Sequence, residues 1–218
     1  MNKINKIILG CTIALGCSLL SSAHAGVISV AQGSFNVSAT ESFETFKPNL
    51  YSSLGVLGGS ANMTGTGSAA TGQYFIANQG SWGLNSTNQG WTNVLPSQGN
   101  RFATIYGSGY VDVTFGPGVS SFGGYFADVF VSSDTTFSFY DQQNNLLATS
   151  TKDFQSLAGE MIWAGFTSDT LLGRVRISGD ETAIDGLVIG SNKVPEPGTI
   201  ALLGLGLAAL SWRRRNNA

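Results

Sequence analysis

Short apolar runs separated by turn-forming residues fill the chain between residues 26 and 190. Several runs alternate apolar with polar residues, as where Phe137 and Phe139 alternate with Thr136 and Ser138. A period of two places the apolar side chains on one face of a strand and leaves the other face in water. We therefore predict half-buried strands at residues 27–30, 35–37, 73–77, 101–106, 110–115, 124–131, 135–140, 146–150, 160–166, 172–177 and 183–189.

The number and spacing of these runs favour an all-β fold. No long stripe with a helical period is present, and the sequence is rich in glycine, with 29 residues, and in aromatic side chains, at 11%. This pattern predicts an antiparallel β-sandwich over residues 26–190. Residues 141–145 read Asp-Gln-Gln-Asn-Asn and predict a hairpin loop between two strands, because Asx residues tolerate turn conformations.

Two stretches resist assignment as strands. Residues 55–72 consist mainly of Gly, Ser, Thr and Ala, and such a composition predicts either a mobile loop or a weak edge hairpin. Residues 78–100 are polar and carry Trp82 and Trp91, which predicts long loops that hold two aromatic rings.

The first 25 residues have the three parts of a secretory signal peptide. Two lysines precede an apolar stretch at residues 7–20, and a small-x-small site follows, which predicts cleavage by signal peptidase between Ala25 and Gly26, with Ala23 as the other small residue. A second possibility is lipoprotein processing at Cys17, although Ala14 occupies a position where a leucine is normally required.

Removal of this leader changes the chemical inventory. Both cysteines and the single histidine, His24, lie inside it, so the remaining domain has no disulfide, no thiol nucleophile and no imidazole base. This excludes Ser-His-Asp, Cys-His and Cys/His zinc chemistry. Residues 26–194 hold six basic against twelve acidic residues, a net charge near −6, which argues against nucleic acid as a partner.

Three unlike segments follow one another at the C-terminus, over residues 191–218. Pro195, Glu196 and Pro197 come first, and two prolines so close together hold the backbone extended. An apolar run without charges spans residues 198–212, and Arg213, Arg214 and Arg215 follow it in the basic tail at 213–218. This order predicts a short transmembrane helix whose C-terminal end faces the cytoplasm.

The same order resembles the C-terminal sorting signal of PEP-CTERM proteins. The resemblance implies handling by an exosortase, an intramembrane transpeptidase-like enzyme of Gram-negative bacteria that produce exopolysaccharide. It implies export through the inner membrane, anchoring in that membrane before processing, and delivery to the cell surface or the extracellular matrix. An ordinary single-pass tail anchor that follows a proline pair is the alternative.

A second, looser resemblance concerns the globular part. The segments 41–44 and 183–187 look like the first and last strands of jelly-roll carbohydrate-binding or galactose-binding-like modules. In such modules an early acidic residue and a late aspartate often share Ca²⁺, which implies a structural calcium site at Glu44 and Asp185. The alternative is that both residues are ordinary turn and edge acids.

Exposed aromatic side chains suggest a ligand. Sugar rings stack on aromatic faces, and Trp82, Trp91 and Tyr106 lie in or beside polar segments, so we predict polysaccharide contact there. The alternative is that Trp82 and Trp91 cap the ends of the sandwich. Trp163, between Ile162 and Ala164, is expected in the core.

Catalysis would have to rest on a pair of carboxylates of the glycosidase kind. No spacing pairs the candidates, which are Glu41, Glu44, Asp128, Asp134, Asp141, Asp153, Glu160 and Asp185. We therefore predict a non-catalytic binding or structural domain. The alternatives are a secreted carbohydrate-active enzyme and a self-associating matrix protein without a small ligand.

Overall fold

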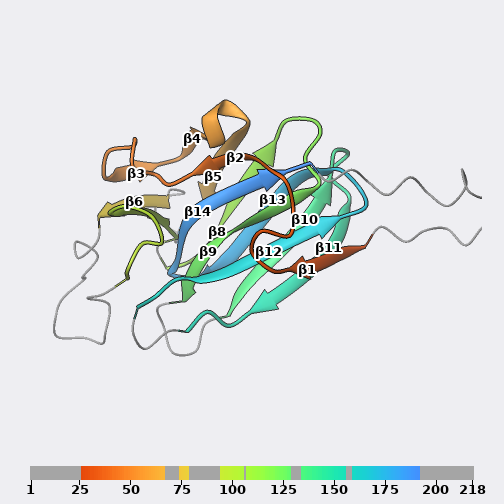
Figure 1. Cartoon of the computed structure of the whole chain (residues 1–218). Helices are drawn as coiled ribbons and strands as arrows, with labels where there is room; N and C mark the ends of the chain where they lie inside the picture. Colours follow the sequence, from red (N-terminus) through yellow and green to blue (C-terminus); the bar gives the residue numbers. More distant parts are fainter. Residues whose placement is uncertain are drawn as a thin grey trace, which may run out of the picture.

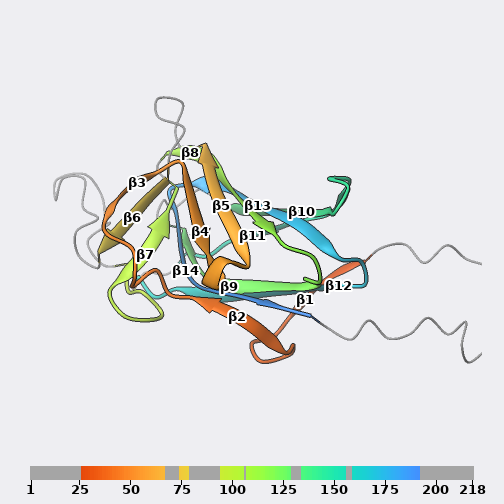
Figure 2. The same ribbon diagram turned by 90° about the horizontal axis from the view of Figure 1, so that it is seen from above.

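The computed structural model describes residues 26–66, 74–78, 94–105, 107–128, 134–155 and 159–191. Within these ranges the chain forms 14 strands and one short 3-10 helix, η1 (Leu57–Gly59). All pairs of neighbouring strands are antiparallel, and the strands form two sheets that pack face to face (Figures 1 and 2). The prediction of an all-β antiparallel sandwich is confirmed.

The larger sheet has eight strands in the order β1-β12-β9-β14-β7-β6-β3, with β2 also paired to β14. Their bounds are β1 (Val27–Val30), β2 (Val37–Glu41), β3 (Asn49–Tyr51), β6 (Tyr74–Asn78), β7 (Arg101–Thr104), β9 (Ser121–Asp128), β12 (Ile162–Ser168) and β14 (Thr182–Gly190). The smaller sheet has six strands in the order β11-β10-β13-β8-β5-β4. Their bounds are β4 (Ser53–Val56), β5 (Ala61–Thr66), β8 (Ser108–Phe115), β10 (Thr135–Asp141), β11 (Leu146–Lys152) and β13 (Leu172–Asp180).

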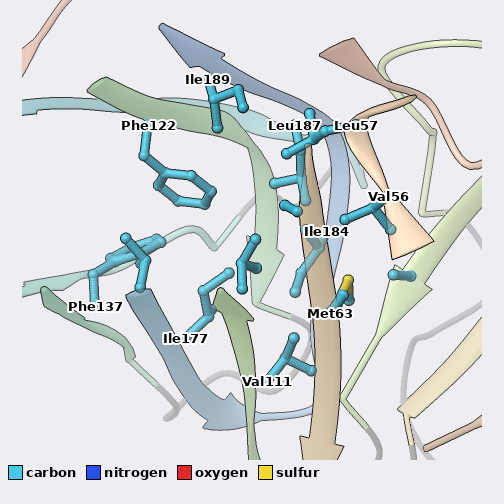
Figure 3. Packing of buried hydrophobic residues seen from close by; sticks show 14 of the residues in the cluster. Val56, Leu57, Met63, Val111, Phe122, Phe137, Ile177, Ile184, Leu187 and Ile189 are labelled. Carbon is cyan, nitrogen blue, oxygen red and sulfur yellow. The ribbon is translucent and has the colours of Figure 1, made fainter. Parts of the chain in front are cut away.

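The core lies between the two sheets, where apolar side chains from both point toward one another (Figure 3). Phe137 and Phe139 of β10 are fully buried, whereas the alternating residues Thr136 and Ser138 are partly exposed, as the alternation predicts. Burial of one such phenylalanine contributes about 2–3 kcal/mol, so the aromatic side chains of the interior contribute strongly to the stability of the fold.

Strand β14 is the centre of the larger sheet, and all nine of its residues are buried. It pairs with β9 on one edge, and two strands share its other edge. β7 pairs with Ala183 and Ile184, and β2 pairs further along, from Leu187 to Gly190, with a register shift of the β9 ladder between Asp185 and Val188.

Both ends of the described chain lie at one end of the sandwich (Figure 1). Gly26 N–H donates to Asp169 Oδ1 at 2.9 Å, next to Ser168, whose N–H donates to the Ser120 carbonyl at 2.8 Å. Ser120 N–H in turn donates to the Gly190 carbonyl at 3.0 Å. A short chain of hydrogen bonds therefore joins the first residue of the domain to the last residue of β14.

The glycine-rich stretch forms a hairpin as far as the structure describes it. β4 and β5 pair with each other, β5 also pairs with β8, and β4 forms the edge of the smaller sheet. Met63 of β5 is fully buried, and this contact with the core fixes a segment of weak strand propensity. Of the two alternatives, the edge hairpin is confirmed for residues up to 66, and residues 67–72 lie outside the description.

Other boundaries differ from the prediction. The predicted strand at 35–37 is wrong, since β2 begins at Val37. Phe35 instead packs on Gly190, where an added Cβ would lie 2.8 Å from the Phe35 ring. The hairpin loop at 141–145 is confirmed: Asp141 and Asn145 are joined by a backbone hydrogen bond of 3.0 Å, and Asn144 adopts a positive φ of 65°.

The predicted leader and the predicted C-terminal helix lie outside the described residues. Among the residues that are described, no helix is long and apolar enough to cross a membrane.

Candidate functional site

The two sheets differ in what covers their outer faces. On the larger sheet, Phe102, Ala127 and Ala183 pack under Val94 and Met161, which come from two covering segments. These segments are joined by a hydrogen bond of 2.9 Å between Leu95 N–H and the Gly159 carbonyl. Part of the outer face of the larger sheet is thus a second, smaller core.

The outer face of the smaller sheet carries side chains that are all at least partly exposed, and we call it the open face. It combines hydroxyl, amide, aromatic and charged groups from five strands. Its residues include Asn62, Thr64, Ser108, Tyr110, Asp112, Thr114, Thr136, Ser138, Tyr140, Thr149, Thr151, Arg174, Arg176, Ser178 and Asp180.

A cluster of three charged residues lies at the centre of the open face. Arg176 is the cross-strand partner of Asp112 and binds it through two hydrogen bonds, Nε to Oδ1 and Nη2 to Oδ2, each 2.8 Å long. Arg174 Nη1 donates to the same Oδ2 at 2.9 Å. One carboxylate therefore holds two guanidinium groups and fixes both side chains against the sheet.

Two tyrosines flank this cluster. The Arg176 guanidinium carbon lies 3.6 Å from the ring centroid of Tyr110, and that of Arg174 lies 3.8 Å from the ring centroid of Tyr140. Arg174 Nη2 also donates to Asn144 Oδ1 in the adjacent hairpin at 2.7 Å. Cation–π contacts and ionic hydrogen bonds thus connect five side chains in one line across the sheet. In order of contact they are Tyr110, Arg176, Asp112, Arg174 and Tyr140.

Hydrogen bonds shift the pKa values of two charged side chains on this face, Arg176 and Asp141. The hydrogen bond to Asp112 raises the pKa of Arg176 further, so its guanidinium stays protonated. At the rim of the face, hydrogen bonds from the Asn145 side chain and backbone lower the pKa of Asp141. Asp141 Oδ1 accepts from the N–H groups of Gln143 and Asn145, so this carboxylate faces its own hairpin. The centre of the open face keeps two cations and one anion.

The structure brings the predicted metal ligands Glu44 and Asp185 to one segment, residues 97–101, to which both bind through hydrogen bonds. Asp185 Oδ2 accepts from Ser97 Oγ at 2.8 Å and from Gln98 N–H at 2.9 Å. Glu44 Oε1 accepts from the N–H groups of Asn100 and Arg101 at 2.7 and 2.6 Å. The two carboxylates thus fix this segment in place through hydrogen bonds.

The donor set does not fit calcium. Ca²⁺ takes six to eight oxygen ligands. Among the described residues, no group of three or more His, Cys, Asp or Glu side chains could hold a metal ion. The nearby carbonyl oxygens of Glu44 and Phe46 already accept hydrogen bonds from Nη1 of Arg101. A guanidinium therefore occupies the point where these oxygens converge, which favours the alternative that both acids are structural.

Asp185 is a fully buried carboxylate, and burial raises its pKa to about 6. Its Oδ1 has no hydrogen-bond partner among the described residues. Other acids also bind backbone N–H groups, among them Glu41, Asp128 and Asp153. Glu41 binds Phe43 and Leu57, Asp128 binds Phe154 at 3.0 Å, and Asp153 binds Gln155 at 2.9 Å.

The predicted sugar-binding residues Trp82, Trp91 and Tyr106 all lie outside the described residues. The placement of Trp163 in the core is wrong. Its indole ring lies half-buried on the outer face of the larger sheet, directly over two glycines. The ring also contacts Tyr125 edge-on, with the ring centroids 5.4 Å apart.

Sequence reasoning missed the open-face cluster. Alternation did place Arg174 and Arg176 on the wet side of a strand. The further signal was that Tyr110, Asp112 and Tyr140 occupy the wet side of two other alternating strands.

Residues 193–215 match the model of the PEP-CTERM protein-sorting motif. The chain carries a PEP-CTERM sorting signal. This motif implies export, a membrane-anchored C-terminus before processing, and processing by an exosortase, as the resemblance of the sequence predicted. The curated proteins contain no match to the chain.

Three solved structures are similar to parts of this chain. The cleaved adhesin domain K2 of Lys-gingipain has 11% identity and a TM-score of 0.47, over 70% of this chain and 97% of that one. TmCBM61, solved in complex with β-1,4-galactotriose, has 10% identity and a TM-score of 0.37, over 61% and 88%. The CBM22-1-CBM22-2 tandem domain of Xyn10C from Paenibacillus barcinonensis has 12% identity and a TM-score of 0.34, over 78% and 49%. At this level of similarity these structures carry no information on the ligand of this chain.

Proposed function

We propose that this PEP-CTERM protein is an exported, non-catalytic module that binds extracellular polysaccharide through the open face. Its sorting signal delivers it to the cell surface or the exopolysaccharide matrix. The observation that carries the proposal is the line from Tyr110 through Asp112 to Tyr140, with both arginines between the rings.

The chemistry of this face suits sugars. Aromatic rings pack against the apolar C–H faces of sugar rings, and charged and hydroxyl groups bind the sugar hydroxyls. Cross-strand pairs hold the polar groups in place, so little side-chain entropy is lost when a ligand binds. Tyr110 and Tyr140 lie on two strands of one sheet, β8 and β10, with β13 between them. That arrangement suits an extended chain better than a single sugar in a closed pocket.

The non-catalytic assignment is supported by the state of the acids. Glu41, Glu44 and Asp185 each accept hydrogen bonds from backbone N–H groups, and so does Asp128. A carboxylate engaged in this way is a structural anchor. On the open face, both oxygens of Asp112 accept hydrogen bonds from the guanidinium groups of Arg174 and Arg176, so this carboxylate is also engaged within the protein.

The test is affinity electrophoresis of the mature domain in gels that contain the producing cell's own exopolysaccharide. We expect the wild-type domain to be retarded, and a Tyr110→Ala, Tyr140→Ala double variant to migrate as it does without polysaccharide. Tyr125→Ala is the matched control, because this tyrosine lies on the larger sheet and should leave the retardation unchanged.

Melting curves confirm that each variant is folded. Equal retardation of wild type and double variant would contradict binding at the open face. Oligomers that form without glycan, together with no retardation, would instead favour the self-associating alternative. Release of reducing sugars from the polysaccharide would contradict the non-catalytic assignment.

A further inference from the structure

We infer that the open face selects acidic polysaccharides, and that Arg176 binds the carboxylate of a uronic acid residue. This inference rests on the proposed function and names the chemical class of its ligand. It starts from the charge balance of the cluster, in which Arg174 and Arg176 share the single carboxylate of Asp112.

The geometry of Arg176 leaves one side of its guanidinium available. Nε and Nη2 donate to Asp112, which uses one edge of the planar fork. None of the described residues accepts a hydrogen bond from Nη1, so the edge formed by Nη1 and the second hydrogen of Nη2 remains. A guanidinium edge with two parallel N–H groups matches a carboxylate, which it binds through two hydrogen bonds.

Exposure distinguishes the two arginines. The Arg176 side chain is 29% exposed, against 16% for Arg174 and 14% for Asp112. Arg174 is also tied to Asn144 by its Nη2, which leaves it less free to bind a ligand. Arg176 is therefore the cation that a polymer lying on the face would reach, while Asp112 and Arg174 orient it.

The composition of the face favours an acid over a neutral sugar. Guanidinium groups donate hydrogen bonds and accept none, so a ligand must supply acceptors at this point. Asp112 supplies one negative charge for the two guanidinium groups, so a carboxylate on the ligand would balance the second positive charge. The domain as a whole has a strong acidic excess, since residues 26–194, the cluster included, have a net charge near −6. A polyanion is therefore repelled by the overall charge of the domain and attracted locally by the two guanidinium groups at the centre of the open face.

The test compares two polymers that differ only in this group: polygalacturonate and the same polymer after chemical reduction of its carboxyl groups. Binding to each is measured by isothermal titration calorimetry at low and at physiological salt. We expect wild type to bind polygalacturonate at least about tenfold more tightly than the reduced polymer, with a preference that shrinks as salt rises.

Three variants locate the effect. Arg176→Gln should abolish the preference, and Arg176→Lys should keep only part of it, because a lysine retains the charge but not the fork. Lys47→Gln removes one positive charge from an exposed position away from the open face and should leave the preference intact.

Equal binding of the two polymers by wild type overturns the inference, and so does an unchanged preference in Arg176→Gln. Both results leave the proposed function in place, because the domain still binds a polysaccharide. If wild type binds neither polymer, the inference is also overturned, and retardation by the producer's own polysaccharide then decides the proposed function separately.

Discussion

Glu41 Oε2 accepts a hydrogen bond of 3.0 Å from the backbone N–H of Leu57, sixteen residues further along the chain. Leu57 has a φ of 57°, a left-handed conformation that is unfavourable for a residue with a side chain. The other oxygen of Glu41 accepts from the N–H of Phe43, whose φ is 60°. One buried carboxylate therefore holds two strained residues, both of which bury their side chains completely or almost completely in the core.

We expect Glu41→Ala to lower the free energy of unfolding by about 3 kcal/mol, because two buried N–H groups lose a charged acceptor. Glu41→Gln keeps one acceptor oxygen and should lose less. Urea denaturation followed by circular dichroism measures both variants. A loss below about 1 kcal/mol in Glu41→Ala would show that Phe43 and Leu57 hold their conformations without this carboxylate.

The stability of the domain should depend on Asp185 between about pH 4 and pH 6. Burial raises the pKa of Asp185 to about 6 in the folded protein, against about 3.9 for an unfolded chain. The folded state therefore binds the proton more tightly. The resulting stabilisation is complete below the unfolded pKa and is lost as pH rises through about 6.

The size of this effect follows from the difference between the two pKa values, and amounts to about 3 kcal/mol. Asp185→Asn should remove it, so the wild-type profile minus the variant profile should fall as pH rises across this range. Burial also raises the pKa of Asp128, and this carboxyl contributes equally to both profiles. Parallel profiles for the two proteins would refute the assignment to Asp185.

Calcium should leave the melting temperature unchanged. Glu44 and Asp185 bind backbone N–H groups of residues 97–101, and Arg101 occupies the neighbouring carbonyl oxygens. Differential scanning fluorimetry in EDTA and in millimolar CaCl₂ measures the response. A rise of several degrees with calcium, abolished in Glu44→Gln, would reinstate the calcium site that the jelly-roll resemblance implied.

The Trp163 indole requires glycine beneath it. A Cβ at Gly123 would lie 2.7 Å from Trp163 Cη2 and 3.1 Å from the Ala164 carbonyl oxygen. Gly123→Ala should therefore destabilise the domain by about 1–3 kcal/mol and change the tryptophan emission. Gly55→Ala is the control, since no atom lies within 4 Å of its added Cβ. Equal melting temperatures for the two variants would mean that the ring moves aside at little cost.

Processing at the sorting signal is expected to remove about two dozen C-terminal residues in a host that has an exosortase. Replacement of Pro195 and Pro197 by Ala, or of Glu196 by Gln, should cause the full-length, membrane-bound form to accumulate. Intact-mass measurement of the released protein checks this. If Ala218 is still present on protein released by wild-type cells, the segment acts only as an anchor.

Much of the fold could be predicted because a strand with one buried face alternates apolar and polar residues, and this alternation is visible in the sequence. Phe137 and Phe139 of β10 alternate with polar residues, and so do Val175 and Ile177 of β13. β5 carries no such pattern beyond Met63, because glycine and small polar residues surround it. Its place is set by pairing with β8, a contact distant in sequence.

The open face could not be assembled from the sequence for the same reason. Arg174 and Asp112 are 62 residues apart, and only the order of β8, β13 and β10 makes them neighbours. The attachment of residues 97–101 by Asp185 and Glu44 could not be predicted for the same reason. Asp185 lies 87 residues from Gln98, and neither residue shows by its type that one binds the backbone of the other.

The position of β14 has a mechanical consequence while the C-terminal tail holds the protein in the membrane. If the domain binds a polymer as proposed, drag on that polymer pulls on the domain through Gly190, the last residue of β14. Hydrogen bonds to β9 on one edge, and to β7 and β2 on the other, lie across the axis of β14. A load along β14 would shear these hydrogen bonds together instead of opening them one after another, so the tail is attached to a strand that is paired on both edges.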